Sequence, residues 1–404
     1  MWDKVKLKKL VSNGGIFIDG DWIESKDQDQ NGQIRLIQLA DIGVGKFIDK
    51  SSRFMTKENA SKLKCTFLKK GDILIARMPD PIGRCCVFPL ETDEKYVTVV
   101  DIAILRHNNE KVSTGFLQHY INSDDFQSKI VPNVTGTTRQ RISRGKLENL
   151  EIPLPPLPIQ EKIAEMLDKA DELRRKDKDL QSKYDELAQA IFIDMFGDPV
   201  RNVKGWEVKR LNALCLKIGS GSTPSGGNES YKSEGISLIR SLNIHQNKFK
   251  YKDLAFIDDK QADKLKNVIV EENDLLFNIT GASVCRTTVV PSNVLPARVN
   301  QHVAILRFDK QHVVPFFAVR LLNNSTMNRH LYAIATQGGA TREAITKEQL
   351  QKLEIIVPPI HFQEEFAKKI EIINQLKAQI NVEKSEQLFQ ALLQKAFKGE
   401  LVNK

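Results

Sequence analysis

Two short segments of the sequence combine glycine, threonine and arginine in the same order. GTTRQRIS begins at Gly136, and GATREAIT begins at Gly339, 203 residues later. Threonine hydroxyls and arginine guanidinium groups donate hydrogen bonds to phosphate oxygens, and a glycine lets the backbone approach a ligand closely. A structural loop, held by its arginine to a neighbouring helix, is the alternative for each segment. On the first interpretation the contacting residues are Thr137, Thr138, Arg139, Arg141, Thr341 and Arg342.

Four further arginines follow predicted strands or lie in the loops at strand ends, where side chains project from a sheet. They are Arg77, Arg84, Arg240 and Arg286, and we expect them to contact the same ligand. An ordinary surface arginine is the alternative at each position. The halves of the chain differ at one of these sites, because Gln38 precedes LADI where Arg240 precedes SLNI.

The charge of the chain is distributed in blocks. The net charge is +9, and residues 1–150 carry 24 Lys and Arg against 19 Asp and Glu. Residues 201–350 carry 21 against 13, whereas residues 151–200 carry 7 against 12 and residues 351–404 carry 8 against 7. Two basic blocks fit a polyanionic partner such as nucleic acid, and solubility alone is the plainer alternative.

Motifs for catalysis are missing from the sequence. A DNA amino-methyltransferase needs Asn or Asp before its Pro-Pro pair, but the two Pro-Pro pairs follow Leu154 and Val357. No phosphate loop of the ATP-driven motor type occurs. Residues 79–80 and 93–95 fit a loose P-D…D-x-K pattern for Mg²⁺-dependent nucleases, and a solvated loop is the better interpretation. We therefore predict no catalytic residue.

Metal, disulfide and membrane features are also not expected. The seven histidines show no ligand spacing, so no metal site is predicted. The five cysteines form no C-x-x-C pair and indicate reduced thiols in a cytoplasmic protein. No run of 18 apolar residues occurs, and the N-terminus lacks the apolar core of a signal peptide.

The elements that must position these residues occur twice. IPLPPLPIQEKIA at residues 152–164 matches IIVPPIHFQEEFA at residues 355–367. The segments IRLIQLADI, GDILIAR and DIAILR of the first half match ISLIRSLNI, NDLLFNI and HVAILR of the second, in the same order. Short β-rich segments alternate with segments of helical spacing. The chain is therefore predicted to be a tandem repeat of an α/β (α+β) unit of about 200 residues.

Each repeat ends in a predicted long helix that begins after the Pro-Pro pair. Apolar residues recur in steps of four and three along the first helix, which indicates a heptad seam. From Ile159 to Phe196 this helix would span roughly 57 Å. We expect the two helices to form an antiparallel coiled coil. The predicted seam residues are Ile159, Ile163, Met166, Ala170, Leu173, Leu180, Tyr184, Leu187 and Ile191 in the first helix, and Phe362, Phe366, Ile373, Leu376 and Ile380 in the second, followed by Leu388 and Leu392 after a two-residue slip of the heptad pattern.

The whole pattern resembles the specificity subunit of type I restriction–modification systems. The resemblance depends on the two Pro-Pro…Gln-Glu junctions, the two G-x-T-R loops, the segment WEVKRLNALCLKIGSGSTP and the closing AFKGELV. It implies target-recognition domains at residues 1–155 and 201–358, a central spacer helix at 156–200 and a C-terminal spacer helix at 359–404. Each domain would read one half of a split site in double-stranded DNA.

The resemblance also implies partners. Two modification subunits would dock on the helices and carry S-adenosylmethionine, and restriction subunits would add ATP- and Mg²⁺-dependent translocation and cleavage. The chain itself would hold no cofactor and catalyse nothing, and the helices would fix the separation of the half-sites. Two alternatives remain, which are a self-sufficient DNA methyltransferase or nuclease and a coiled-coil adaptor that binds no nucleic acid.

Overall fold

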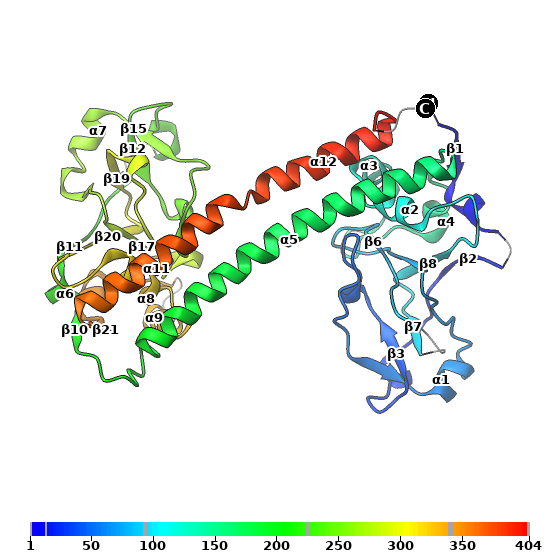
Figure 1. Ribbon diagram of the computed structural model, residues 1–404, viewed down its shortest axis with the longest axis horizontal. Helices are drawn as coiled ribbons and strands as arrows, with labels where there is room; N and C mark the ends of the chain where they lie inside the picture. Colours follow the sequence, from blue (N-terminus) through cyan, green and yellow to red (C-terminus); the bar gives the residue numbers. More distant parts are fainter. Residues whose placement is uncertain (1, 13, 92–94, 224–226, 338–342, 402–404) are drawn as a thin grey trace. The chain divides into compact units, whose positions relative to one another are not determined.

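The computed structural model describes residues 2–12, 14–91, 95–223, 227–337 and 343–401 (Figure 1). The chain forms two compact units. Unit 1 combines Met1–Lys178 with Asn381–Lys404, and unit 2 is Asp179–Ile380. Each unit therefore joins one globular part to helix residues from both predicted spacer segments. The boundaries predicted at residues 155, 200 and 358 follow the sequence pattern, and they stay a prediction.

Unit 1 contains two small sheets and a short ribbon. The main sheet is antiparallel and has the order β2 (Ile16–Asp19), β8 (Ile102–Arg106), β5 (Ile73–Ala76), β6 (Cys85–Val87). In the second sheet, β3 (Ile34–Ile37) pairs antiparallel with β4 (Arg53–Met55) and parallel with β7 (Tyr96–Thr98). The ribbon pairs β1 (Lys4–Lys6) with β9 (Glu151–Pro153), and the short helices are α1 (Lys57–Lys62), α2 (Thr114–Ile121), α3 (Asp124–Ile130) and α4 (Arg144–Leu147).

Unit 2 repeats this arrangement. Its main antiparallel sheet has the order β11 (Cys215–Ser220), β20 (Val303–Phe308), β17 (Leu275–Asn278), β18 (Thr287–Val289). The second sheet has the order β15 (Ala255–Ile257), β12 (Ile236–Ile239), β19 (Ala297–Val299), β16 (Ile269–Val270), with β12 and β19 parallel. Two ribbons accompany these sheets: β10 (Val208–Arg210) pairs with β21 (Glu354–Ile356), and β13 (Ile244–His245) pairs with β14 (Lys248–Phe249). The short helices include α6 (Leu211–Leu214), α7 (Asp259–Asp263), α8 (Pro315–Leu322), α9 (Ser325–Ala335) and α10 (Lys347–Lys352).

The main sheet of each unit is covered on both faces, which explains its apolar strands. In β5 all four side chains are buried, and they alternate between two clusters. Ile73 and Ile75 join the cluster that contains Phe116 of α2, whereas Leu74 joins the cluster that contains Ile37 of β3. The matching strand β17 alternates in the same way. A strand buried on both faces is a continuous apolar run, as the segments GDILIAR and NDLLFNI are. The predicted mixed α/β tandem repeat is confirmed.

The first predicted long helix is α5, Leu157–Phe196. Its first part belongs to unit 1 and its last part to unit 2. In unit 2, α5 runs antiparallel to α11 (Ile360–Gln379), because Asp185 contacts Lys377 and Phe196 contacts Phe366. In unit 1 it packs on α12 (Val382–Lys398), where Arg174 pairs with Glu386.

Two details of the helix prediction are wrong. The second long helix is two helices, because Ile380 is extended and the Asn381 side chain caps α12 by accepting from the Lys384 N–H at 2.8 Å. Leu173, Leu180 and Leu187 were placed in the seam, but they are 43–47% exposed. The predicted seam residues Ile163 and Ala170 are buried in unit 1. Other buried side chains of α5 include Leu167 in unit 1 and Ala188, Phe192 and Phe196 in unit 2.

The helices also bear on the question of membrane insertion. Within the described ranges, no helix combines the length and the apolar character that crossing a bilayer requires.

Candidate nucleic-acid interface

The G-T-T-R loop of unit 1 is a closed and exposed turn. Thr135 and Arg141 exchange two backbone hydrogen bonds of 2.9 Å, which bring the ends of the loop together. Gly136 has φ +95°, and a Cβ atom there would lie 2.4 Å from the carbonyl oxygen of Arg139, so only glycine fits. The predicted contact residues Thr137, Thr138, Arg139 and Arg141 are all exposed. The loop therefore presents its hydroxyl and guanidinium donors to solvent.

Arg77 lies at the base of this loop. Its carbonyl accepts the Ile142 N–H at 3.0 Å, which ties the loop to the end of β5. The Arg77 side chain is buried, donates to the Val100 carbonyl and has its Nε 3.3 Å from Asp19 Oδ1. Burial, with repulsion from Arg141, lowers the pKa of the Arg77 guanidinium. These interactions indicate that Arg77 holds the loop in place. They argue against the predicted contact of its side chain with a ligand.

The residues after the second G-x-T-R motif contact the end of the matching strand of unit 2, β17. The predicted residues Thr341 and Arg342 lie outside the described residues. After them, the Glu343 carbonyl accepts the Gly281 N–H at 2.9 Å, and the Ile345 N–H donates to the Ile279 carbonyl at 2.8 Å. The second bond is the counterpart of the one between Ile142 and Arg77. In each unit the residues after the G-x-T-R motif are therefore tied to the end of the same strand, β5 or β17.

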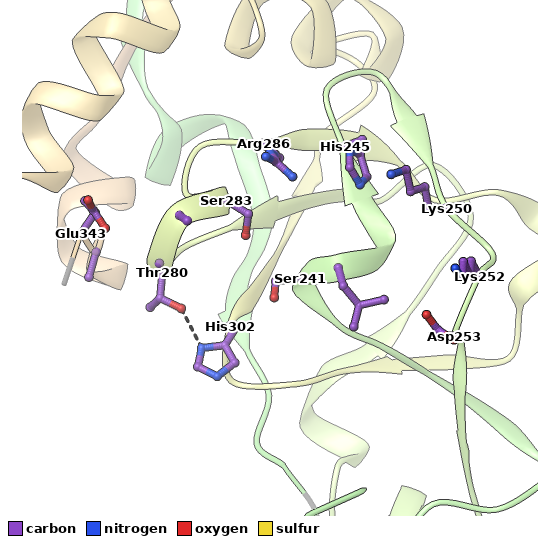
Figure 2. Close-up of a pocket in the computed structure, with 14 residues that line it drawn as sticks. Ser241, His245, Lys250, Lys252, Asp253, Thr280, Ser283, Arg286, His302 and Glu343 are labelled. Atoms are coloured by element: carbon purple, nitrogen blue, oxygen red, sulfur yellow. Dashed lines mark hydrogen bonds between the residues drawn. The ribbon is translucent and has the colours of Figure 1, made fainter. Parts of the chain in front are cut away.

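A polar groove of about 880 Å³ in unit 2 is lined in part by Glu343 and Ala344 (Figure 2). The segment that runs from Ser241 to Asp253 forms one side, and the turn Thr280–Arg286 forms the other. Asn278 connects the two sides, since its Nδ2 donates to the Ser241 carbonyl at 2.9 Å and to the Ser283 hydroxyl at 3.1 Å. The residues that line the groove include Ser241, His245, Lys250, Lys252, Asp253, Thr280, Ser283, Arg286, His302 and Glu343.

One side of the groove carries positively charged side chains. Partial burial lowers the pKa of the His245 imidazole, and repulsion from Lys250, Arg286 and Lys248 adds to this effect. The lowered pKa favours the neutral form of the His245 imidazole, next to positively charged side chains. The sequence-based prediction named Arg286 but missed His245 and the lysines around it, although the segment HQNKFKYK at residues 245–252 carries three lysines without an acid.

Arg84 and Arg286 occupy matching positions with different environments. Arg84 is 7% exposed, and its donors contact the carbonyl groups of Leu39, Ile42, Met78 and Pro81 at 2.7–3.1 Å. Such saturation favours a loop-organising role over the predicted ligand contact. Arg286 is partly buried and lines the groove, and its guanidinium has no acceptor among the described residues.

Arg240 is held at the edge of unit 2. Its guanidinium donates to the Asp253 carbonyl and lies 5.1 Å from the centre of the Tyr231 ring. These interactions orient the Arg240 side chain but leave it partly exposed. In unit 1 the matching residue is Gln38, so this cation occurs in one unit only.

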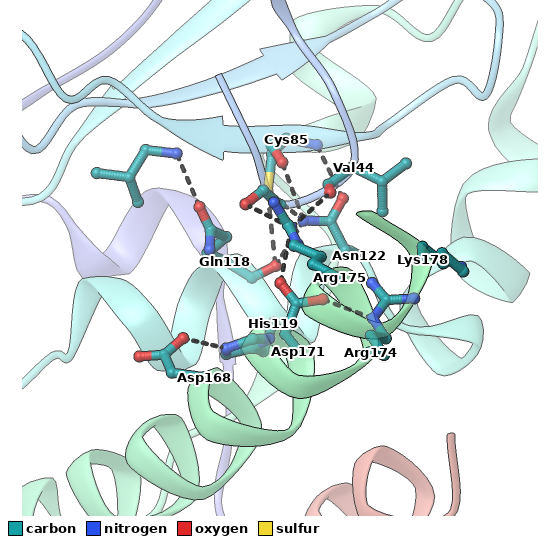
Figure 3. Close-up of polar contacts among 12 residues, drawn as sticks. Val44, Cys85, Gln118, His119, Asn122, Asp168, Asp171, Arg174, Arg175 and Lys178 are labelled. Carbon is teal, nitrogen blue, oxygen red and sulfur yellow. Dashed lines mark hydrogen bonds and ion pairs between the residues drawn. The ribbon is translucent and has the colours of Figure 1, made fainter. Parts of the chain in front are cut away.

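The first part of α5 is fastened to the globular part of unit 1 by polar contacts (Figure 3). Arg175 donates to the Gly45 carbonyl at 3.2 Å and pairs with Asp171 at 2.6 Å. His119 of α2 lies 2.7 Å from Asp168, through its Nε2 and a carboxylate oxygen. These contacts fix the direction in which α5 leaves the domain.

The cysteines are free thiols whose pKa is raised by burial. All five are free, as the sequence predicts. Burial raises the pKa of the Cys65, Cys86, Cys215 and Cys285 thiols to about 12 and that of Cys85 well above its ordinary value. Among the described residues no group of three His, Cys, Asp or Glu side chains is placed to hold a metal ion.

Comparison with known proteins decides the family. Residues 2–181 and 203–390 each match the model of the type I restriction modification DNA specificity domain. The chain belongs to this family. With two such domains in tandem, it is a specificity subunit that recognises a bipartite DNA site. The two matched ranges begin near Trp2 and Trp206, where the two copies of the repeat begin.

Individual relatives are similar over most of this specificity subunit. The MjaIX specificity subunit of Methanocaldococcus jannaschii is 24% identical over 99% of this chain and 93% of the relative. The EcoKI specificity subunit of Escherichia coli strain K12 is 23% identical over 72% of this chain and 66% of the relative. The crystal structure of the type I system S subunit from M. genitalium has a TM-score of 0.61 at 15% identity, over 98% of this chain and 96% of that chain, which shows a shared fold.

Proposed function

We propose that this specificity subunit binds DNA through the G-T-T-R loop of unit 1 and the groove of unit 2. One observation carries the proposal, which is that the segment after each G-x-T-R motif is hydrogen-bonded to the residue that follows the same strand of the repeated sheet, β5 in unit 1 and β17 in unit 2, where Glu343 lines the groove. Exposed arginines and hydroxyls suit the phosphate backbone, and grooves with several donors suit base edges. The two surfaces differ in side chains, so each half of the DNA site would differ in sequence.

The helices are proposed to dock two modification subunits, and restriction subunits would join the complex. Leu173, Leu180 and Leu187 form a seven-residue series along α5 and stay exposed, which suits contact with a partner. Glu161 and Glu364, next to the buried glutamines of the two junctions, are also exposed. In this assembly the chain is non-catalytic and cytoplasmic, while S-adenosylmethionine, ATP and Mg²⁺ belong to the partner subunits.

Methylation patterns test this function directly. The chain is expressed together with the modification subunit of its own system in a host that lacks adenine methylation, and the genome is sequenced for modified bases. A split motif with methyladenine is expected, and it must be absent when either protein is expressed alone. Methylation by the modification subunit alone, at the same motif, would contradict the proposal.

The self-sufficient enzyme is tested with the purified chain. Incubation with DNA and either Mg²⁺ or S-adenosylmethionine should yield neither cleavage nor methyl transfer. Product formation by the chain alone, in an amount that scales with its concentration, would favour that alternative.

A further inference from the structure

Arg84 and Arg286 are equivalent positions of the repeated fold. Arg84 directly precedes β6, and Arg286 directly precedes β18. The backbone carbonyl groups of the two arginines accept equivalent hydrogen bonds of 2.9 Å. The Ala76 N–H donates to Arg84 in unit 1, and the Asn278 N–H donates to Arg286 in unit 2. The two backbones therefore place both arginines at the same point of the sheet.

The Arg84 and Arg286 side chains make different contacts because the loops around them have different conformations. In unit 1 the loop after β5 turns the carbonyl groups of Met78 and Pro81 toward Arg84 and saturates it. In unit 2 the equivalent loop contains the turn Gly281–Ser283, and Asn278 fixes this turn through the Ser283 hydroxyl. Unit 1 has Ala76 in place of Asn278 and cannot make that hydrogen bond. Arg286 is left to line an open groove.

The groove around Arg286 has a mixed polar lining. Lys250 and Lys252 are donors, whereas the carboxylates of Asp253 and Glu343 are acceptors, and hydroxyls can be either (Figure 2). A surface built for phosphate alone would exclude carboxylates, because they repel the phosphate charge. The edges of bases present donors and acceptors together, and an arginine makes its commonest specific contact with guanine O6 and N7.

We infer that Arg286 reads a guanine in the half-site bound by unit 2, whereas its counterpart Arg84 reads no base. The inference rests on the proposed function and names one contact within it. Its consequence is a G·C pair at one fixed position of the second half-site. A guanidinium makes two parallel hydrogen bonds to guanine, which lysine cannot reproduce and which glutamine makes with adenine instead.

The test uses the full complex with the modification subunit and a DNA library that is randomised in the second half-site. Bound DNA is sequenced for the wild type, Arg286→Gln and Arg286→Lys. In the wild type one position should require G·C. Both variants should lose roughly ten- to hundred-fold of the preference for G·C at that position alone, and Arg286→Gln should favour A·T there. The first half-site should be unchanged.

Two control variants separate base reading from other effects. Lys264→Ala removes an exposed cation that does not line the groove and should leave the motif unchanged. Lys250→Ala removes a cation that is placed to contact phosphate. This variant should therefore weaken binding to all sequences equally. The inference is overturned if Arg286→Gln leaves both half-sites unchanged, or if it behaves like Lys250→Ala. A wild-type complex that selects no sequence at all would instead refute the proposed function.

Discussion

Gln160 and Gln363 make the same three hydrogen bonds in the two units. The side-chain oxygen of Gln160 accepts the Ser113 N–H at 2.9 Å, and its amide donates to the carbonyl groups of Lys111 and Pro155 at 3.0 and 2.7 Å. Gln363 accepts the Val314 N–H at 2.9 Å and donates to the carbonyl groups of His312 and Pro358 at 3.0 and 2.7 Å. Both side chains are fully buried. The glutamine therefore locks the Pro-Pro segment, the start of the long helix and the start of α2 or α8 together.

Replacement of this glutamine should destabilise the unit that contains it. Gln363→Ala leaves the Val314 N–H and two carbonyl groups without partners, and we expect a loss of about 2–4 kcal/mol in the free energy of unfolding. Urea denaturation measures this loss. The neighbouring exposed residue provides the control, since Glu364→Gln should change the free energy by less than about 0.5 kcal/mol. Equal stability of the two variants would contradict the account of the junction.

Gly136→Ala should disturb the G-T-T-R loop without unfolding unit 1. The alanine Cβ would meet the Arg139 carbonyl oxygen, and φ +95° is unfavourable for alanine by about 1–2 kcal/mol. We expect weaker DNA binding by the complex, measured by fluorescence anisotropy. Gly145→Ala is the matched control, because Gly145 lies in α4 and its Cβ would meet nothing within 4 Å. Undiminished affinity of Gly136→Ala would show that the loop shape does not matter for binding.

Arg139→Ala and Arg141→Ala should each remove one interaction with a DNA phosphate. The dependence of log affinity on log salt should become shallower by about 0.9 for each phosphate that the variant no longer neutralises. Affinity measurements over a series of salt concentrations give this slope. Lys57→Ala, which removes an exposed cation of α1, should leave the slope at its wild-type value. A slope that is the same in all variants would remove the loop from the DNA interface.

Asp21 should make the stability of unit 1 depend on pH. Burial raises the pKa of this carboxyl from 3.8 to about 6, although the Thr66 N–H stabilises its charged form. Because the folded state binds the proton more tightly, the free energy of unfolding should fall as the pH rises from about 4 through about 6. Asp21→Asn keeps an acceptor for Thr66 and should raise the melting temperature above pH 7 by a few degrees, with little effect near pH 4. An unchanged difference between the two proteins across this range would contradict the shift.

Leucines exposed on α5 should be needed for assembly with the modification subunit. Leu187→Glu should weaken assembly by about tenfold or more, because docking an exposed leucine contributes roughly 1.5–3 kcal/mol. Analytical ultracentrifugation of the mixed proteins measures the assembly. Gln189→Glu adds the same charge at an exposed position two residues away and should assemble normally. Normal assembly of Leu187→Glu would place the partner on another surface.

Sequence alone predicted the repeated fold well because its signals are local. The β-rich runs, the Pro-Pro junctions and the G-x-T-R segments recur at a nearly constant offset. The break between α11 and α12 was missed, although Asn381 is a favourable N-cap residue and the heptad pattern slips there.

Local sequence signals could not predict which arginine is buried and which one lines the groove. Arg84 and Arg286 lie in matching loops before β6 and β18, and Arg84 is buried because carbonyl groups of the distant Leu39 and Ile42 join those of the nearby Met78 and Pro81 around it. The groove of unit 2 was missed because its two sides, residues 241–253 and 280–286, are separated in the sequence and meet through Asn278.

Domain exchange tests the central claim most directly. Residues 201–358 are replaced by the matching domain of another specificity subunit, and methylation is mapped after expression with the modification subunit. The account predicts that one half of the methylated motif changes to that of the donor, while the other half stays as in the wild type. A motif that is unchanged, or that changes in both halves together, would contradict the reading of a split site by two separate domains.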